Sequence, residues 1–304
     1  MENVRAILLM IAAMAGFALE DMFIKSVAER LPAGQILIIL GVGGGAIFAL
    51  WTRAQGHSVF TRTFVAPTVL LRNAGEAIGT MGFVLAITLT PLAEASAILQ
   101  ATPLAVTLGA ALFLGEAVGW RRWGAILVGF CGVLLIIRPG LDGFQPASLF
   151  AVQGVIGLAI RDIATRVVPK DIPTTQLSAY GFFMVVPVGF LMLAFQQPPA
   201  MPNAWESTQL GLGLIIGVVA YYAITAAMRI GDVAVVTPFR YTRLIFALII
   251  GYFVFAETPD QTTLIGAAII IASGLYTLYR ERKAALARSE EHTSELRHRC
   301  ISYA

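Results

Sequence analysis

Long apolar segments separated by short polar connections run through almost the whole chain. Each is close to the roughly 17–25 residues that an α-helix needs to cross a bilayer. Ten such segments lie at about 7–25, 34–52, 66–87, 91–114, 121–138, 147–167, 174–195, 208–228, 232–255 and 262–280. The pattern predicts an all-α integral membrane protein with ten transmembrane helices.

The composition supports this prediction. Of the 304 residues, 58% are hydrophobic and only 13% are charged, whereas soluble proteins carry roughly 25% charged residues. Two cysteines, Cys131 and Cys300, are too few for a disulfide scaffold. The high hydrophobicity excludes disorder. The first apolar segment follows Arg5 without a cleavage site of small residues, so we expect no signal peptide.

The distribution of Lys and Arg predicts the orientation. If the N-terminus is cytoplasmic, eleven of these residues fall in or next to inner connections and three, Lys25, Arg30 and Arg138, fall outside. Short cytoplasmic loops are enriched in Lys and Arg. We therefore expect a multi-pass protein of a bacterial inner membrane with both termini in the cytoplasm.

The last residues differ in character from the rest of the chain. Residues 288–304 read RSEEHTSELRHRCISYA, a polar and charge-rich run. Residues 288–296 resemble the translation of a short-read sequencing adapter. We interpret 288–304 as a non-native tail and leave it out of the fold prediction, with an ordinary cytoplasmic tail as the alternative.

The two halves of the chain are related by one constant shift along the sequence, from position 21 to position 162 (162 − 21 = 141 residues), called the repeat shift below. It makes identical polar or proline residues coincide at four pairs of positions, namely Asp21 and Asp162, Pro32 and Pro173, Gln35 and Gln176, and Glu116 and Glu257. The halves 1–140 and 141–287 thus each contain five predicted spans. Because five is odd, the second half enters the membrane from the opposite side. Such inverted repeats are typical of secondary transporters, whose substrate site lies between the repeats.

The segment 86–137 resembles the EamA repeat of the drug/metabolite transporter superfamily. The resemblance rests on Pro103, on Glu116 after Gly115, and on the Gly-rich helix that follows. A second copy at 231–279 keeps the equivalent Glu257 but has its proline at Pro238. The resemblance covers about residues 5–283. It implies two inverted five-helix repeats around a central cavity lined mainly by helices 1, 3, 4, 6, 8 and 9. The opening stretch, from Met1 to Ile38, is also similar to riboflavin importers of this superfamily.

Nine charged residues lie within the predicted spans, where a charge costs about 3 kcal/mol at the bilayer centre. They are Glu20, Asp21, Arg72, Glu76, Glu94, Arg161, Asp162, Arg240 and Arg243. Acids and guanidinium groups around one cavity would suit a zwitterionic metabolite. Alternatively, Asp21 and Asp162 pair with Lys25 and Arg166, each four residues further along the same helix.

Some of these residues have more specific predicted roles. Arg72 and Glu76 are four residues apart, which predicts a same-helix ion pair that could also line the cavity. Arg240 and Arg243 have no acid on their own helix, so they need partners elsewhere or an anionic group of the substrate. Arg240 is the strongest candidate for a substrate contact.

Uncharged residues complete the candidate site. Gln100 is a hydrogen-bonding group in the middle of the fourth helix, and Tyr221, Tyr222 and Tyr241 could stack on a planar ligand. Pro103 and Pro238 should kink their helices and serve as hinges. Glu116 and Glu257 follow small residues at helix ends, and we interpret them as structural caps.

No enzymatic motif accompanies these features. Outside the tail 288–304, His57 in a loop is the only histidine, which cannot build a zinc site, and neither a P-loop nor a GxSxG motif is present. We expect no enzyme, no metal, no cofactor and no nucleic-acid partner. We expect a secondary transporter that lies in a lipid bilayer and moves a small polar metabolite, in the first place an amino acid or related zwitterion. Riboflavin import and a passive channel or facilitator are the alternatives. Proton coupling through Asp21, Glu76 or Asp162 and a homodimer are compatible with the sequence.

Overall fold

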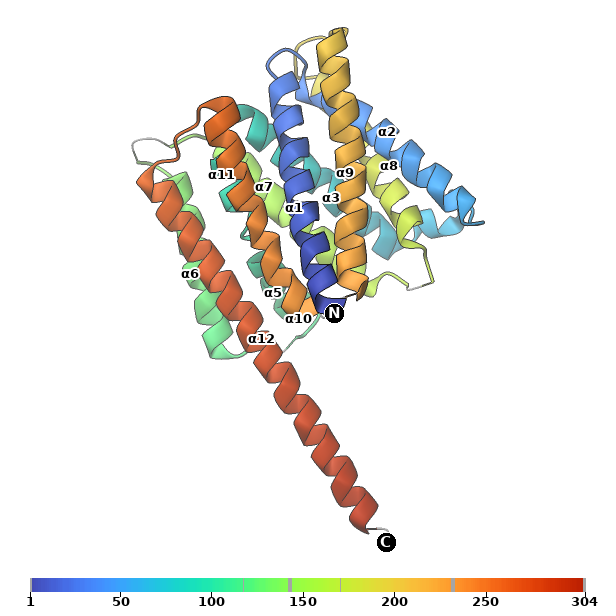
Figure 1. Ribbon diagram of the computed structural model, residues 1–304, viewed down its shortest axis with the longest axis vertical. Coiled ribbons are helices and arrows are strands. Elements are labelled where there is room, and N and C mark those ends of the chain that lie inside the picture. The colour runs from blue at the N-terminus through green and yellow to red at the C-terminus, as the bar shows by residue number, and fades with distance from the viewer. Residues whose placement is uncertain (1, 117, 142–143, 170, 231–232, 303–304) are drawn as a thin grey trace.

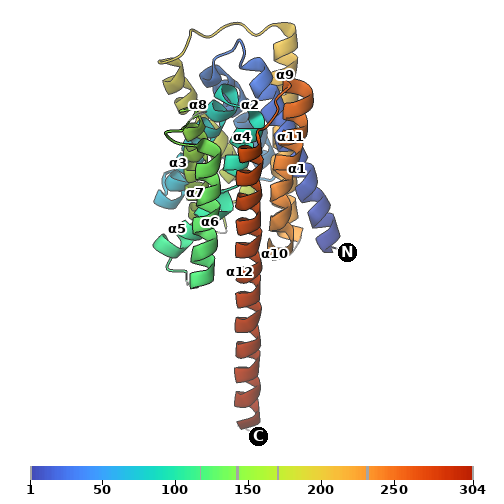
Figure 2. The same ribbon diagram turned by 90° about the vertical axis from the view of Figure 1, so that its left-hand side faces the viewer.

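The computed structural model describes residues 2–116, 118–141, 144–169, 171–230 and 233–302, and over these residues the regular structure is entirely helical. Long helices lie side by side in one bundle (Figure 1). The N-terminal end of α1 and the C-terminal part of α12 lie at the same end of the bundle in both views (Figures 1 and 2). An even number of crossings places both chain ends on one side of the membrane.

Each half of the chain supplies four long helices and one span that is broken into pieces. The first half contains α1 (Glu2–Val27), α2 (Ala33–Ala54), the 3₁₀ turn η1 (Arg62–Val65), α3 (Pro67–Leu89), α4 (Leu92–Leu99), α5 (Thr102–Phe113) and α6 (Trp120–Ile137). The second half contains α7 (Ser148–Val167), α8 (Thr174–Leu193), α9 (Ala204–Ile230), α10 (Val233–Val236), the 3₁₀ turn η2 (Thr237–Tyr241), α11 (Thr242–Phe255) and α12 (Gln261–Ser302).

The number of spans agrees with the sequence prediction. Within the described ranges, nine helical segments are long and apolar enough to cross a membrane. The remaining long helix, α3, has 23 residues and contains Arg72 and Glu76. At 1.5 Å per residue it measures about 34 Å, which is enough for a hydrocarbon core of roughly 30 Å. The predicted all-α membrane fold with ten helices is confirmed.

The helix pairings show that the two halves are built alike. α1 packs along α9, and α3 packs along α7. Exchanging the first five spans with the last five converts one of these pairings into the other. The pairings of α2 with α8 and of α6 with α12 are each unchanged by the same exchange. This pattern is the one expected of two repeats related by a pseudo-twofold axis.

Glycine allows the helices of opposite halves to approach closely. A Cβ atom on Gly157 of α7 would lie 2.3 Å from the backbone nitrogen of Gly79 in α3. At the α2–α8 contact, a Cβ on Gly34 would lie 2.6 Å from the carbonyl oxygen of Gly189. Small residues at helix contacts are typical of membrane proteins. The hydrophobic effect does not drive helices together within lipid, so close van der Waals packing stabilises their contacts instead.

Both predicted kinks are confirmed as breaks in the helix. The fourth span is interrupted between α4 and α5, since Pro103 has no N–H to donate to the carbonyl of Leu99. The hydroxyl of Thr102 donates to that carbonyl instead, at 2.6 Å. Pro238 lies in η2, which interrupts the ninth span. That these breaks act as hinges stays a prediction.

The last helix extends well beyond the bundle. α12 continues to Ser302, whereas the sequence predicts that the tenth span ends near residue 280. In Figure 2 this extension leaves the bundle as a single helix on the side where the N-terminus lies. That 288–304 is a non-native tail stays a prediction.

Candidate functional site

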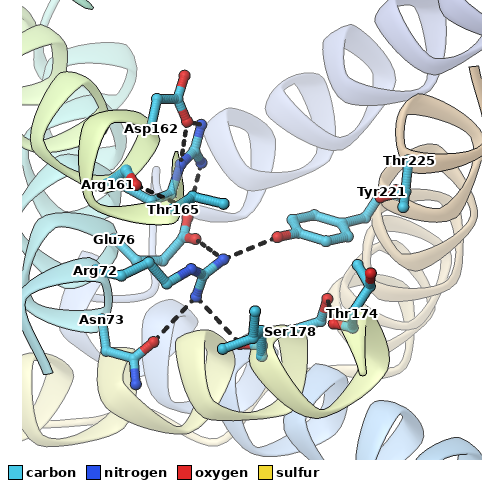
Figure 3. A network of polar contacts seen from close by, with 11 residues as sticks. Arg72, Asn73, Glu76, Arg161, Asp162, Thr165, Thr174, Ser178, Tyr221 and Thr225 are labelled. Carbon is cyan, nitrogen blue, oxygen red and sulfur yellow. Dashed lines mark hydrogen bonds and ion pairs between the residues drawn. The ribbon is translucent and has the colours of Figure 1, made fainter. Parts of the chain in front are cut away.

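A continuous polar network joins α3, α7 and α9 inside the bundle (Figure 3). The Nη2 atom of Arg72 lies 2.9 Å from Oε2 of Glu76, so the predicted same-helix pair is formed. Oε1 of Glu76 lies 3.0 Å from Nη1 of Arg161, and Nε of Arg161 donates to Oδ1 of Asp162 at 2.8 Å. Nη2 of Arg72 also donates to the hydroxyl of Tyr221 at 3.0 Å. The network therefore links side chains from both repeats.

Arg72 is the fixed centre of this network. Its exposure is 3%. Besides the contacts above, its Nη1 atom donates to the carbonyl of Leu177 in α8 and to Oδ1 of Asn73, both at 3.1 Å. Gly181 of α8 provides the space, because a Cβ there would lie 2.4 Å from Nη1 of Arg72. Both terminal nitrogens of Arg72 are thus engaged by protein groups.

Asp162 does not form the same-helix pair that the sequence allowed. Its carboxylate binds the neighbouring Arg161, while Arg166 pairs with Glu116 at 2.8 Å. The alternative prediction that Asp162 pairs with Arg166 is therefore wrong. Glu116 comes from the first repeat, so Arg166 also bridges the two halves.

A second buried ion pair joins α1 to α11. Nη2 of Arg243 lies 2.7 Å and 3.0 Å from the two carboxylate oxygens of Asp21, which is 3% exposed. The guanidinium also lies over the rings of Phe17 and Phe83, with 5.3 Å and 4.9 Å to the ring centroids. The predicted alternative, a pair between Asp21 and Lys25, is not formed. Arg243 thus finds its acid on another helix.

Two charged residues of the predicted set have no such partner. Half-buried Arg240 makes neither a hydrogen bond nor an ion pair with any residue in the described ranges. Asp162 attracts its charge through space, while Arg161 and Arg243 repel it. Glu20 likewise has no hydrogen-bonding or ion-pair partner among the described residues.

Glu20 lies where α1 packs against α9. Its carboxylate faces Gly217, at which a Cβ atom would lie 2.3 Å from Oε1. The repeat shift places Glu20 at the position of Arg161 and Gly217 at that of Glu76. The α3–α7 contact therefore holds an ion pair where the equivalent α1–α9 contact holds a lone carboxylate beside a glycine.

The tyrosines are not gathered around one point. Tyr221 belongs to the network, whereas Tyr222 is 52% exposed and its ring packs on Trp51 at 5.0 Å between centroids. The hydroxyl of Tyr241 points at Gly274 of α12, where a Cβ would lie 1.8 Å from it. The structure therefore does not bring these three rings together as one stacking surface.

Gln100 and Glu94 lie in different parts of the fourth span. Nε2 of Gln100 donates to the carbonyl of Tyr241 at 3.3 Å, so the breaks of the two broken spans meet. Glu94 lies in the first turn of α4 and accepts a hydrogen bond from Ser148 at the start of α7. It therefore belongs to the end of the bundle and not to its middle, which corrects the expectation of a mid-membrane charge.

Comparison with known proteins places this architecture in a family. The model of the EamA-like transporter family matches the chain twice, at residues 4–138 and 145–279. A solved crystal structure with 21% sequence identity covers 91% of this chain and 98% of its own with a TM-score of 0.62, which supports the fold.

Several curated relatives are transporters. An S-adenosylmethionine uptake transporter of Rickettsia bellii is 28% identical over 221 residues, which cover 71% of this chain and 73% of the relative. A riboflavin transporter of Vibrio cholerae is 31% identical over 195 residues, 64% of either chain. A pseudopaline exporter of Pseudomonas aeruginosa is 27% identical over 278 residues, 88% of this chain and 93% of the relative.

The twofold family match covers nearly all of the ten-helix bundle, and the relatives carry small molecules rather than convert them. The protein is thus a multi-pass membrane transporter of a small metabolite and not an enzyme. The chain belongs to the EamA-like transporter family.

Proposed function

We propose that this protein transports a zwitterionic metabolite with an amino-acid head group, of the class to which S-adenosylmethionine belongs. The observation that carries the proposal is the guanidinium of Arg240, which has no ion-pair partner among the residues that the structure describes. Transport by alternating access in a bacterial inner membrane, with both termini in the cytoplasm, is part of the same proposal.

The other interior arginines already have anionic partners. Arg72, Arg161 and Arg243 each pair with a carboxylate at 3.0 Å or less. Arg240 lacks one among the described residues, and a charge that is half-buried without a partner still loses part of its hydration at a cost. The carboxylate of an amino acid can accept two parallel hydrogen bonds from one guanidinium, which is the strongest neutralisation available to Arg240.

Glu20 supplies an acidic group that can bind a cationic group of the substrate. Glu20 adjoins Asp21 in α1, and Arg240 lies just before Arg243 in the chain, so both groups are near the Asp21–Arg243 pair. One free acid and one free base match a ligand that carries both an anionic and a cationic group. S-adenosylmethionine has a carboxylate, an ammonium and a sulfonium, and several relatives of this chain are uptake transporters for it.

Riboflavin is the second candidate because of an aromatic cluster beside the network. The ring of Tyr221 packs edge-on against Phe48 and Phe182, with centroids 5.6 Å and 6.1 Å apart. A flat isoalloxazine ring is suited to such surroundings, and the relative from Vibrio cholerae is named a riboflavin transporter. Riboflavin is uncharged at neutral pH, so it would leave Glu20 and Arg240 without a counter-charge.

Counterflow into proteoliposomes separates these candidates. Vesicles preloaded with S-adenosylmethionine, riboflavin or methionine are offered the same compound in labelled form. We expect saturable accumulation of S-adenosylmethionine, and a loss of about 10- to 150-fold in kcat/KM in Arg240→Gln because one charged hydrogen-bonding contact is removed. Arg121→Gln is the matched control, since Arg121 lies on the exposed ring of Trp120.

The outcomes are distinct. Riboflavin accumulation that is unaffected by Arg240→Gln would replace the zwitterion proposal with the flavin one. Flux that rises linearly with concentration and shows no counterflow would indicate a passive channel. Wild-type kinetics for S-adenosylmethionine in Arg240→Gln would refute the role of Arg240.

A further inference from the structure

A compact polar cluster around Lys25 lies at one end of the bundle. The ammonium of Lys25, in the last turn of α1, lies 3.1 Å from Oε1 of Glu257. It also donates to the carbonyls of Ile87 and Thr90, at 2.9 Å and 2.7 Å. Oε2 of Glu257 accepts from the backbone N–H of Leu92 at 2.8 Å. One lysine and one glutamate therefore hold the connection between α3 and α4.

This cluster crosses the boundary between two groups of helices. Lys25 belongs to α1, which packs on α9 and α11, and Glu257 closely follows α11. The connection that they bind leads from α3, which packs mainly on α7, to α4, which packs on both α7 and α11. The side chains of Lys25 and Glu257 are only 16% and 13% exposed, so this boundary is closed to solvent.

The inverted repeat places an equivalent pair at the opposite end. The repeat shift carries Lys25 onto Arg166 and Glu116 onto Glu257. Arg166 and Glu116 are likewise paired, at 2.8 Å, but their side chains are 44% and 39% exposed. The two ends thus carry matching cross-repeat ion pairs, one buried and the other open to solvent.

We propose that these two ion pairs are the latches of the transport cycle. The Lys25–Glu257 latch closes one face of the membrane and must release the α3–α4 connection before that face opens. The Arg166–Glu116 latch does the same for the other face. The Lys25–Glu257 latch consists of ionic and backbone hydrogen bonds, so water entering that end can replace its contacts, whereas an apolar plug would resist wetting.

The proposal predicts opposite effects of neutralising each latch. The test uses Arg240→Cys as a reporter in a chain that also carries Cys131→Ser and Cys300→Ser. A membrane-impermeant cationic methanethiosulfonate is applied to either face of sealed vesicles. This readout is independent of the transported compound, so it stays valid even if the substrate proposal fails.

We expect Lys25→Gln and Glu257→Gln each to raise the labelling rate from one face by about tenfold, the effect of one charged contact. Arg166→Gln should raise it from the opposite face. Arg30→Gln is the matched control, because Arg30 pairs with Glu206 at the same end but joins α9 to the loop after α1, within one group of helices. It should change neither rate.

Equal labelling rates in all variants, or a rise from the same face for both latches, would overturn the proposal. Folding is monitored by size-exclusion chromatography in detergent. The conservative variant Lys25→Arg provides a second check, because it keeps the positive charge and the N–H donors that face Glu257 and the two carbonyls, and its labelling rate should stay close to that of the parent. Labelling of Lys25→Arg that is as fast as that of Lys25→Gln would also contradict the latch.

Discussion

Removing either member of the Asp21–Arg243 pair alone should destabilise the protein almost as much as removing both. Asp21 is 3% exposed and accepts bonds of 2.7 Å and 3.0 Å from Nη2 of Arg243 and one of 3.2 Å from Nε. Removing one member leaves an uncompensated charge inside the bundle. Removing both leaves a small cavity but no charge.

The expected magnitudes follow from this geometry. Deleting one partner of a buried pair costs about 3–5 kcal/mol. The loss for Asp21→Ala should be about 3 kcal/mol, because the remaining Arg243 keeps its contacts with Phe17 and Phe83. The loss for Arg243→Ala should be about 4 kcal/mol, since the carboxylate is left without a cation and both ring contacts are lost. The double variant should fall about 2–3 kcal/mol short of the sum of the two losses.

Reversible unfolding in mixed dodecyl maltoside and sodium dodecyl sulfate micelles measures these free energies as a double-mutant cycle. The control cycle is Arg166→Ala with Glu116→Ala, whose side chains are 44% and 39% exposed. Its coupling should stay below about 1 kcal/mol. If the losses of Asp21→Ala and Arg243→Ala simply add to within about 0.5 kcal/mol, the pair is not coupled and the argument from burial is wrong.

Two further predictions concern packing and pH. Gly157→Ala should cost about 1–3 kcal/mol in the same unfolding assay, because its Cβ would lie 2.3 Å from the α3 backbone. Its control Gly124→Ala, whose Cβ would meet nothing within 4 Å, should be neutral or slightly stabilising. Equal effects of the two substitutions would refute the close-contact interpretation. The hydrogen bond from Arg138 holds the pKa of Asp260 well below its ordinary value of 3.8, so the ionised carboxylate contributes stability above about pH 4 that is lost as the pH falls further. The melting temperatures of wild type and Asp260→Asn should therefore differ by a small amount at pH 7, because the carboxylate is half-exposed. This difference should shrink as the pH falls below about 4. A difference that does not change with pH would contradict the assignment.

The sequence was sufficient for the parts of the fold that depend on local properties. Apolar length alone predicts the ten spans, because a bilayer requires a minimum number of residues to cross it. Pro103 and Pro238 predict the broken spans, since a residue without an N–H interrupts the helix wherever it lies. The repeat shift predicts two similar halves, which the helix pairings then show.

The pairing of charges could not be predicted in the same way. Asp21 and Arg243 are 222 residues apart, and their contact depends on α1 packing next to α11. Local spacing offered Lys25 as a partner for Asp21, but a helical neighbour at the fourth position contributes only about 0.5 kcal/mol at best. A partner on an adjacent helix that also excludes water easily outweighs it.

For two of the tyrosines, their spacing in the sequence already indicates that they point in different directions. Tyr221 and Tyr222 are consecutive on α9, so their side chains point about 100° apart, and only one of them can face the network. The exposure of Tyr222 follows from that geometry. The sequence also indicates the position of Glu94, because this residue comes near the start of its predicted span and therefore near the end of the bundle.

The ion pairs of the two repeats correspond at the ends of the bundle but not in its interior, and this contrast bears on function. At the ends, Lys25 with Glu257 and Arg166 with Glu116 are true counterparts, as two faces that open in turn would require. In the interior, the Arg161–Glu76 pair corresponds to a lone Glu20 beside a glycine. A substrate is not twofold symmetric, so a site that recognises one must depart from the symmetry of the repeats. The repeat shift carries Leu99 onto Arg240, so Arg240 also departs from the symmetry. Substitution of Glu20 or Arg240 should therefore change what is transported, whereas substitutions in the latches should change only which face is open.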